Sequence, residues 1–332
     1  MKITENLRKR FCKDFNIPIN MFRDNFFMER LELLNDFYGT KRKWEIFKNE
    51  VSRYDNEQDY FEYYNKTKDD AISHIKATEG FRRFNAEDMS KFEIPQPYRN
   101  LPTKDIYHAS NVGKSFVSID ITKANFSCLN FYDSEIFEHQ GYWENYIGLY
   151  TSLKHIIESK YIRQVILGNC NPGRQVTYEK WIMYTLLQWI VGETEGSVRL
   201  PLEDVAMFSN DEIVLYDNGN IKWDYLMRVV GNFTTNSGIP IHVEKFKLVE
   251  FGDLAYVKLI EDDTLEIKCA KAEFLPMIIH GIQGGKIDYH DLFFMYEGEL
   301  ARFEDVPDKV ITACERWEYE YGFIGSKKNI TS

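Results

Sequence analysis

Two aspartates stand where carboxylates could bind divalent metal ions. Asp120 lies near the end of the apolar run Phe116-Val-Ser-Ile-Asp120, and Asp211 lies in the turn Ser209-Asn-Asp-Glu212 between two apolar runs. Mg²⁺ prefers oxygen ligands such as carboxylates. Phosphoryl transfer often uses two metal ions about 3.5–4 Å apart, which stabilise the attacking and leaving oxygens. The two aspartates therefore predict a phosphoryl-transfer site with Mg²⁺ or Mn²⁺ as its cofactor.

A second interpretation of Asp120 is structural. A buried carboxylate without a partner is costly. Asp120 therefore either has a cationic partner, such as Lys123 or Lys245, or binds a metal ion. A single aspartate in a strand is common, and so is an Asn-Asp-Glu turn. The surrounding elements and their order must distinguish the two interpretations.

Those elements are predicted from apolar periodicity and from turn residues. Residues 1–90 are expected to be mainly helical, and three prolines in 94–102 interrupt the chain. Strands are expected at 115–122, 163–167, 239–251, 255–260 and 265–270, with a β-hairpin over 205–216. Helices are expected at 142–160, 176–191, 221–233, 274–281 and 306–321. Strands and helices that alternate in this way form a sheet backed by helices, which is an α+β fold.

The order of these segments resembles that of the palm-domain nucleic-acid polymerases, especially the reverse transcriptases. Asp120-x-x-x-Ala-x-Phe126 resembles their motif A, and the Asn-Asp-Glu hairpin resembles motif C. The Asp-Glu-Ile-Val sequence of that hairpin is closer to that of family A DNA polymerases. Between the two, 168–177 and the following helix resemble motif B, and 239–248 resembles motif D. The likeness covers roughly residues 115–255.

The resemblance implies a right-hand polymerase fold with three regions. Residues 1–102 would form a helical, fingers-like N-terminal region. Residues 103–260 would form the palm-like catalytic domain, an antiparallel sheet backed by helices. Residues 261–332 would form a small thumb-like region.

The resemblance also implies catalytic roles. Asp120 and Asp211 would bind the two metal ions, and the backbone carbonyl of Ile121 would complete one coordination shell. Glu212 would be a weaker ligand or would support the ligands without contacting the metal. Lys245, in motif D, would protonate the leaving pyrophosphate.

Three further residues are expected to contact the nucleotide. Arg174 and Lys180, at the start of the long helix, are the candidates for holding the triphosphate. Asn125 stands where reverse transcriptases carry an aromatic ring that excludes the ribose 2′-hydroxyl. Asparagine is smaller and hydrogen-bonds a hydroxyl, so we expect weak discrimination against ribonucleotides.

The resemblance therefore predicts a nucleotidyltransferase of the DNA- or RNA-polymerase type, acting in phage or viral replication or transcription. Its expected partners are template and primer nucleic acid, nucleoside triphosphates and replication proteins. Two alternatives stay open. One is a non-catalytic palm-like protein that binds nucleic acid or a replication partner. The other is a template-independent nucleotidyltransferase.

Charge and composition bound these predictions. The chain carries a net charge of −11, but residues 1–114 hold 21 basic and 19 acidic side chains, so the first third is the better candidate to face phosphates. Five scattered cysteines, with no CxxC pair, indicate neither a disulfide framework nor a zinc site. No signal-peptide-like or membrane-length apolar run is present. We expect a cytoplasmic protein with no membrane partner.

A second nucleotide-binding motif is incomplete. Asn111-Val-Gly-Lys-Ser115 resembles the end of a phosphate-binding P-loop. The full pattern requires glycine where this chain has His108, and it requires a helix after the Lys-Ser pair. A strand is expected there instead, so the motif does not predict an ATPase.

Overall fold

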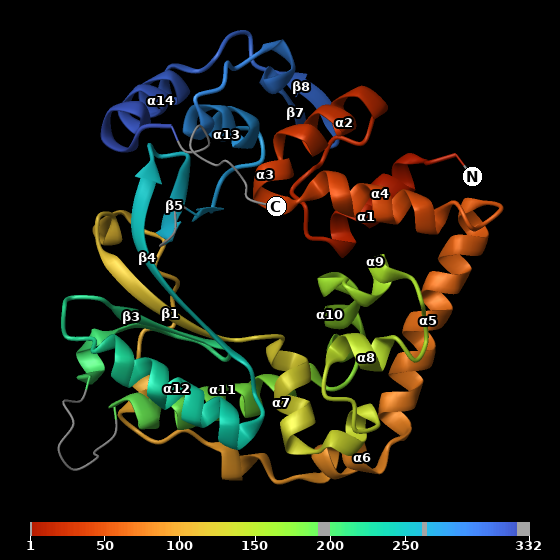
Figure 1. Ribbon diagram of the computed structural model, residues 1–332, viewed down its shortest axis with the longest axis vertical. Coiled ribbons are helices and arrows are strands. Elements are labelled where there is room, and N and C mark those ends of the chain that lie inside the picture. The colour runs from red at the N-terminus through yellow and green to blue at the C-terminus, as the bar shows by residue number, and fades with distance from the viewer. Residues whose placement is uncertain (1, 192–199, 261–263, 324–332) are drawn as a thin grey trace. The chain divides into compact units, whose positions relative to one another are not determined.

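The structure is a computed structural model that describes residues 2–191, 200–260 and 264–323, and it has the predicted α+β fold (Figure 1). The strands join in the order β2-β3-β1-β4-β5-β6, and a separate pair is formed by β7 and β8. Contacts divide the chain into two compact units. Unit 1 contains residues 1–57, 107–113 and 247–332, and unit 2 contains residues 58–106 and 114–246.

Unit 2 holds the motifs discussed above. Its strands are β1 (Ser115–Ile121), β2 (Val205–Phe208), β3 (Glu212–Tyr216) and the first part of β4 (Ile241–Phe251). Its helices are α5 (Glu57–Ala77, which begins at the unit boundary), α6 (Glu79–Ala86), α7 (Ala124–Tyr132), α8 (Trp143–Ile147), α9 (Lys154–Ile157), α10 (Lys160–Gly168), α11 (Pro172–Val191) and α12 (Trp223–Ser237). Short 3₁₀ turns are η1 (Met89–Phe92), η2 (Tyr98–Asn100), η4 (Ser134–Phe137) and η5 (Leu202–Asp204).

The strands of unit 2 have a defined topology. The chain runs β1, helices, β2, β3, α12, β4, and the strands lie in the order β2-β3-β1-β4. β3 pairs antiparallel with both β1 and β2. This is the order of the ferredoxin-like β-α-β-β-α-β motif. It places β1, which carries Asp120, between the hairpin and β4.

The two faces of this sheet differ in character. Side chains alternate between faces along a strand, so Val117, Ile119 and Ile121 of β1 share one face, and all three are buried. Figure 1 shows α11 and α12 running along one face of β1 and β3, and α11 contacts β3. Apolar burial of this kind fixes the register, because a one-residue slip would turn the apolar side chains to the other face.

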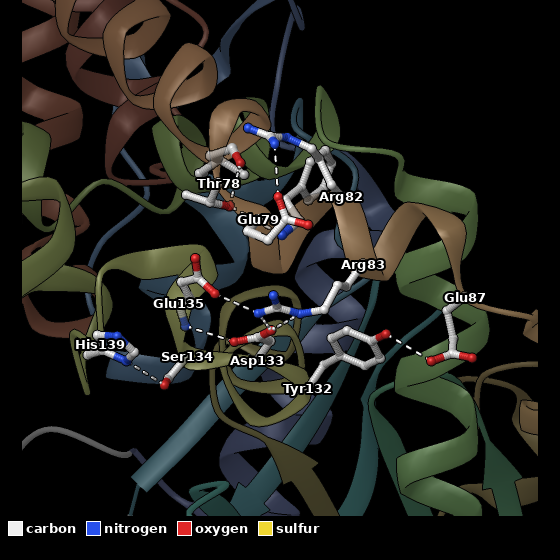
Figure 2. Close-up of polar contacts among 12 residues, drawn as sticks. Thr78, Glu79, Arg82, Arg83, Glu87, Tyr132, Asp133, Ser134, Glu135 and His139 are labelled. Atoms are coloured by element: carbon white, nitrogen blue, oxygen red, sulfur yellow. Dashed lines mark hydrogen bonds and ion pairs between the residues drawn. The ribbon is translucent and has the colours of Figure 1, made fainter.

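A polar clamp joins α6 to the segment after α7 (Figure 2). Arg83 of α6 donates hydrogen bonds to Asp133, and it donates a third to Glu135 Oε2 over 2.5 Å. Gly80 allows the close approach, because a Cβ there would lie 3.0 Å from the Asp133 carboxyl group. The side chain of Asp133 also caps η4 by accepting from the backbone N–H of Glu135. Residues some 50 positions apart are thereby held together.

Unit 1 combines both ends of the chain. Its helices are α1 (Glu5–Asp14), α2 (Asp24–Leu33), α3 (Asn35–Tyr38), α4 (Thr40–Val51), α13 (Leu275–Gln283) and α14 (Asp308–Tyr321). Its strands are the end of β4, β5 (Ala255–Ile260), β6 (Thr264–Lys268), β7 (Phe293–Tyr296) and β8 (Glu299–Arg302), with 3₁₀ turns η3 (Ala109–Asn111) and η6 (Tyr289–Leu292). One apolar core lies among β4, β5, α13 and α14.

A buried ion pair joins α2 to the C-terminal part of unit 1. Arg30 Nη1 lies 2.9 Å from Asp291 Oδ1, and both side chains are buried. His280 Nε2 lies 3.1 Å from the other oxygen of Asp291. Burial alone would raise the pKa of Asp291, but the hydrogen bond from His280 and the charge of Arg30 bring it below its ordinary value. Unit 1 therefore depends on residues from both ends of the sequence.

Several predicted elements are confirmed and two are wrong. β1, the β2–β3 hairpin and β5 lie where the sequence placed them. Residues 163–167 are part of helix α10 rather than a strand. Ser159 accepts a hydrogen bond from Ile162 N–H at its start, and Ile162 and Ile166 are buried at helical spacing. Residues 142–160 contain short helices rather than one long helix, and the β7–β8 pair was not predicted.

The division into units also differs from the predicted regions. Residues 1–57 group with 247–332, whereas 58–106 group with the strands of unit 2. None of the helices in the described residues combines the length and apolar character that crossing a membrane requires.

Candidate functional site

The backbone brings Asp120 and Asp211 together at one end of the β1 and β3 strands. Asp120 is paired with Glu212 across the antiparallel β1 and β3 strands. The N–H of Ile121 donates a 2.9 Å hydrogen bond to the backbone carbonyl of Asp211. Two residues 91 positions apart in sequence thus become neighbours, Asp120 on β1 and Asp211 in the turn before β3.

The turn between β2 and β3 is held by one serine. Ser209 N–H donates to Glu212 O over 2.9 Å, and its hydroxyl oxygen accepts from the N–H of Glu212 over 3.0 Å. The same hydroxyl lies 3.1 Å from Asp211 Oδ1. A serine that bonds its own turn fixes the local backbone. The Asp211 carboxylate is therefore carried on a rigid turn.

Asp120 has no direct cationic partner. Within the described part of the chain its side chain makes no hydrogen bond and no ion pair. Burial, together with the negative charges of Asp211 and Glu212, raises the pKa of Asp120 to about 6, against weaker opposing effects of His242 and Lys160. Like charges gathered in this way disfavour ionisation of each other.

The two lysines considered as partners of Asp120 are engaged elsewhere. Lys123 Nζ lies 2.5 Å from Glu144 Oε1. Lys245 Nζ lies 2.9 Å from Asp217 Oδ2. Asp217 N–H bonds Ser115 at the far end of β1, about 16 Å along the strand from Asp120. Neither lysine neutralises the candidate site.

Lys245 also lies on the wrong face for its expected role. The ring centroids of Phe116 and Phe246 lie 5.6 Å apart in a stacked arrangement, so the two rings lie on the same face of the sheet. Asp120 is four residues after Phe116 on β1 and therefore shares that face. Lys245, one position before Phe246, points to the opposite face. The geometry does not bring this lysine to a pyrophosphate leaving from Asp120 and Asp211, and it gives no support to a proton-donor role.

Glu212 lies beside Asp120 and is oriented by a serine. It faces Asp120 across the strands, and Ser118 Oγ donates to Glu212 Oε1 over 2.5 Å. Ser118, Asp120 and Glu212 share one face of the sheet because of the strand alternation. The same face also carries the buried Phe116, so the polar groups lie at one end of it. Glu212 is thus placed next to the pair of aspartates rather than free to rotate into it.

Glu179 is a site residue that the sequence did not suggest. It lies on α11, is only 4% exposed, and accepts a 2.8 Å hydrogen bond from Asn210 Nδ2 in the hairpin turn. Burial raises the pKa of Glu179 to about 7, and the nearby charge of Asp211 contributes. The only sequence signal was an acidic residue next to the buried Tyr178 on a largely apolar helix. Its partner lies 31 positions away.

The three expected nucleotide contacts have different environments. Arg174 donates to the backbone carbonyls of Phe84 and Glu87 and so holds the end of α6. Lys180 Nζ lies 5.7 Å from the ring centroid of Phe208, at the start of the hairpin turn. Asn125 Oδ1 accepts from the N–H of Phe126 in the first turn of α7. Lys180 thus contacts the last residue of β2, whereas Arg174 is occupied by the backbone.

The donor set suits a hard divalent cation. Carboxylate oxygens are preferred by Mg²⁺ and Mn²⁺, and Mg²⁺ is commonly bound by one or two carboxylates with waters and substrate phosphates. Over the described ranges, no three His, Cys, Asp or Glu side chains are already grouped as a ligand set. Asp120 and Asp211 would therefore share an ion with oxygens from outside the side chains of the protein.

Comparisons with known proteins add no family. The chain matched no protein-family model, no curated protein and no solved structure.

Proposed function

We propose that the protein is a nucleotidyltransferase that extends a nucleic-acid strand by metal-dependent phosphoryl transfer. Asp120 and Asp211 are the metal-binding carboxylates of this proposal. The observation that carries it is that the two aspartates lie close together at the end of β1. Asp120 is partly buried there and has no ion-pair partner among the described residues. Burying like charges without a counter-ion costs free energy, and a divalent cation would compensate that cost.

The residues around the aspartates support the same chemistry. Bound Mg²⁺ or Mn²⁺ would supply charge stabilisation at the transferring phosphoryl group. Asp120 and Asp211 would hold the ions, and the Asn210–Glu179 hydrogen bond would keep the hairpin turn in position. Glu212, bonded to Ser118, would tune the charge of Asp120. Fixed carboxylates contribute through positioning, which dominates in phosphoryl transfer.

The finer proposal is a polymerase palm. The order of strands, with the Asp120 strand beside the acidic hairpin and helices along one face, is compatible with the motif A and motif C resemblance. Template, primer and nucleoside triphosphates are the corresponding partners. Ile121 and Asn125 follow Asp120 at the edge where the nucleotide would enter.

A template-independent nucleotidyltransferase is the second candidate. It would use the same carboxylates but would contact less nucleic acid. The observation in its favour is charge. Residues 115–332 carry a net charge of −13, whereas residues 1–114 carry +2. Strong net negative charge opposes binding of a long phosphate backbone.

Strand extension is the test of the proposal. Labelled primer, with and without template, is incubated with deoxy- or ribonucleotides and Mg²⁺ or Mn²⁺. We expect extension by the wild-type protein and at least about a hundredfold loss in Asp120→Asn and Asp211→Asn, because each removes a charged metal ligand. Asp217→Asn is the matched control, since it alters a carboxylate at the other end of β3.

Three results decide the outcome. Dependence on template separates the polymerase from the template-independent enzyme. Comparable use of both sugar types supports the expectation for Asn125, and strict use of deoxynucleotides contradicts it. Full activity in either aspartate variant, or no activity with any metal, would contradict the proposed function and favour a non-catalytic binding protein.

A further inference from the structure

Three basic residues, Lys123, Lys160 and Arg163, lie at the starts of α7 and α10. Lys160 begins α10, is exposed, and is one of two cations whose charge acts on Asp120. Arg163 follows three residues later, so both side chains leave neighbouring positions on the helix surface. Lys123 follows β1 directly, in a left-handed backbone conformation with φ 54°. Helix α10 contacts α7, which begins at the residue after Lys123.

Arg163 is the least satisfied cation of this group. Its Nε is buried without a hydrogen-bond partner, and the side chain makes no hydrogen bond or ion pair within the described residues. Burial lowers the pKa of Arg163, and only the charge of Glu144 opposes this effect. Guanidinium donors are rarely left buried without an acceptor. An anionic ligand would supply the missing acceptor.

Glu144 on α8 serves two of the three cations. Its Oε1 lies 2.5 Å from Lys123 Nζ, and its charge is the one that favours ionised Arg163. Among the described residues, Glu144 forms an ion pair with Lys123 but none with Arg163. Lys160 meanwhile has no ion pair with any described residue. Within the described part of the chain, the three cations therefore have one ion pair, that of Lys123 with Glu144.

We propose that Lys123, Lys160 and Arg163 form a polyphosphate-binding site, and that Glu144 occupies part of it when the ligand is absent. The ligand class is the triphosphate chain of a nucleotide, because the charge of Lys160 acts on Asp120 and Lys123 directly follows the strand that carries Asp120. This choice of ligand rests on the proposed function. Glu144 is an internal competitor, so its removal strengthens binding of the phosphates.

The proposal revises the residues expected to hold the triphosphate. The guanidinium group of Arg174 donates hydrogen bonds to the backbone carbonyls of Phe84 and Glu87. A ligand would have to displace those bonds, which hold the end of α6. Arg163 and Lys160 have no such bonds to lose within the described part of the chain. Charge-assisted contacts to phosphate are among the strongest hydrogen bonds in proteins.

The test is binding of inorganic tripolyphosphate to the full-length protein, by calorimetry in low salt with chelator present. We expect Lys160→Ala and Arg163→Met each to weaken binding by about tenfold, the effect of losing one charge-assisted contact. Glu144→Gln is expected to tighten binding by about threefold or more. Lys66→Ala is the control, because that lysine lies exposed on α5 beside Asp70.

Matched ligands identify the source of the phosphate. A nucleoside triphosphate competing with tripolyphosphate at the same variants supports the proposal. Preferential binding of a short oligonucleotide, with the same variant effects, overturns the choice of ligand. Unchanged tripolyphosphate affinity in Lys160→Ala, which removes an exposed side chain and should fold normally, overturns the site. Weaker binding by Glu144→Gln overturns its role as a competitor.

Failure of this site and failure of the proposed function give different results. Tripolyphosphate binding requires neither metal, primer nor turnover. Binding with the expected variant pattern, but without strand extension, leaves the site intact and rejects the proposed function. Strand extension with an unchanged KM for nucleotide in both Lys160→Ala and Arg163→Met rejects the site and keeps the function.

Discussion

Asp120 illustrates how a functional group can cost stability. Its pKa of about 6 lies above the ordinary value for aspartate, because burial and the charges of Asp211 and Glu212 oppose its ionisation. A raised carboxyl pKa in the folded state means that stability falls as the group ionises. The loss begins near the ordinary pKa and is complete above the folded-state pKa.

Replacing Asp120 should therefore stabilise the metal-free protein. At pH 8, Asp120→Asn is expected to raise the melting temperature by on the order of 2–4 °C, because it removes an unpaired charge. The difference should shrink as the pH falls through about 6 and vanish near pH 4. Thermal unfolding in chelator, scanned over this pH range, measures it.

Metal addition provides the complementary observation. Mg²⁺ or Mn²⁺ should raise the melting temperature of the wild-type protein and leave Asp120→Asn nearly unchanged, since ligands that bind only the folded state stabilise it. A variant less stable than wild type at pH 8 would mean that Asp120 has a structural partner after all.

At the scale of elements, the α6 clamp depends on a missing side chain. Gly80→Ala would place a Cβ 3.0 Å from the Asp133 carboxyl group and 3.1 Å from Ile136. Asp133 cannot readily yield, because Arg83 binds it and it caps η4 (Figure 2). We expect a loss of about 1–3 kcal/mol in the free energy of unfolding, typical of overpacking.

Gly231 in α12 is the matched comparison. A Cβ there meets nothing within 4 Å. Gly231→Ala should therefore stabilise the protein by about 0.5–1 kcal/mol, because alanine is the better helix former. Denaturant unfolding of both variants measures the contrast. Equal effects of the two substitutions would show that the approach of α6 to Asp133 is not tight.

The elements that the sequence predicted well have strong local patterns. β1 and the hairpin are short apolar runs bounded by turn residues, and they lie where expected. The run 163–167 was misread because a short apolar stretch fits either a strand or a buried helix. The N-cap Ser159 decides for a helix through a hydrogen bond that the pattern alone did not reveal.

The candidate site was predictable only in part, for a related reason. Asp120 and Asp211 lie on elements with clear patterns, so their meeting could be anticipated. Glu179 joins through one hydrogen bond to Asn210, and such a contact leaves no periodic trace. The side of the strand on which Lys245 lies follows from alternation. Its ion pair with Asp217 depends on strand register and could not be foreseen.

At the scale of the molecule, neither unit is a continuous segment. The chain passes between them near residues 57, 106, 113 and 246. Residues 261–332 are therefore not expected to behave as a removable domain. In unit 1, Arg30 of α2 depends on Asp291, and Phe26 packs its ring 5.2 Å from that of Phe293.

A chain that ends at residue 260 should lose structure at its other end. Deletion removes the partners of α2, so its amides should lose protection from hydrogen exchange. Asp291→Ala is the point-mutant counterpart and should cost about 3–5 kcal/mol, because it leaves a buried guanidinium without its counter-ion. Unchanged protection of α2 in the shortened chain would show that residues 1–57 fold without the C-terminal part.

The buried pair of Arg30 and Asp291 also sets an order of events during synthesis. The two residues are separated by 261 positions, and ribosomes add about 5–20 residues per second. The first helices therefore wait roughly 13–50 s before their counterpart emerges. During that interval the aromatic face of α2 is uncovered, so nascent chains of this protein are suitable clients for chaperones that shield apolar surfaces.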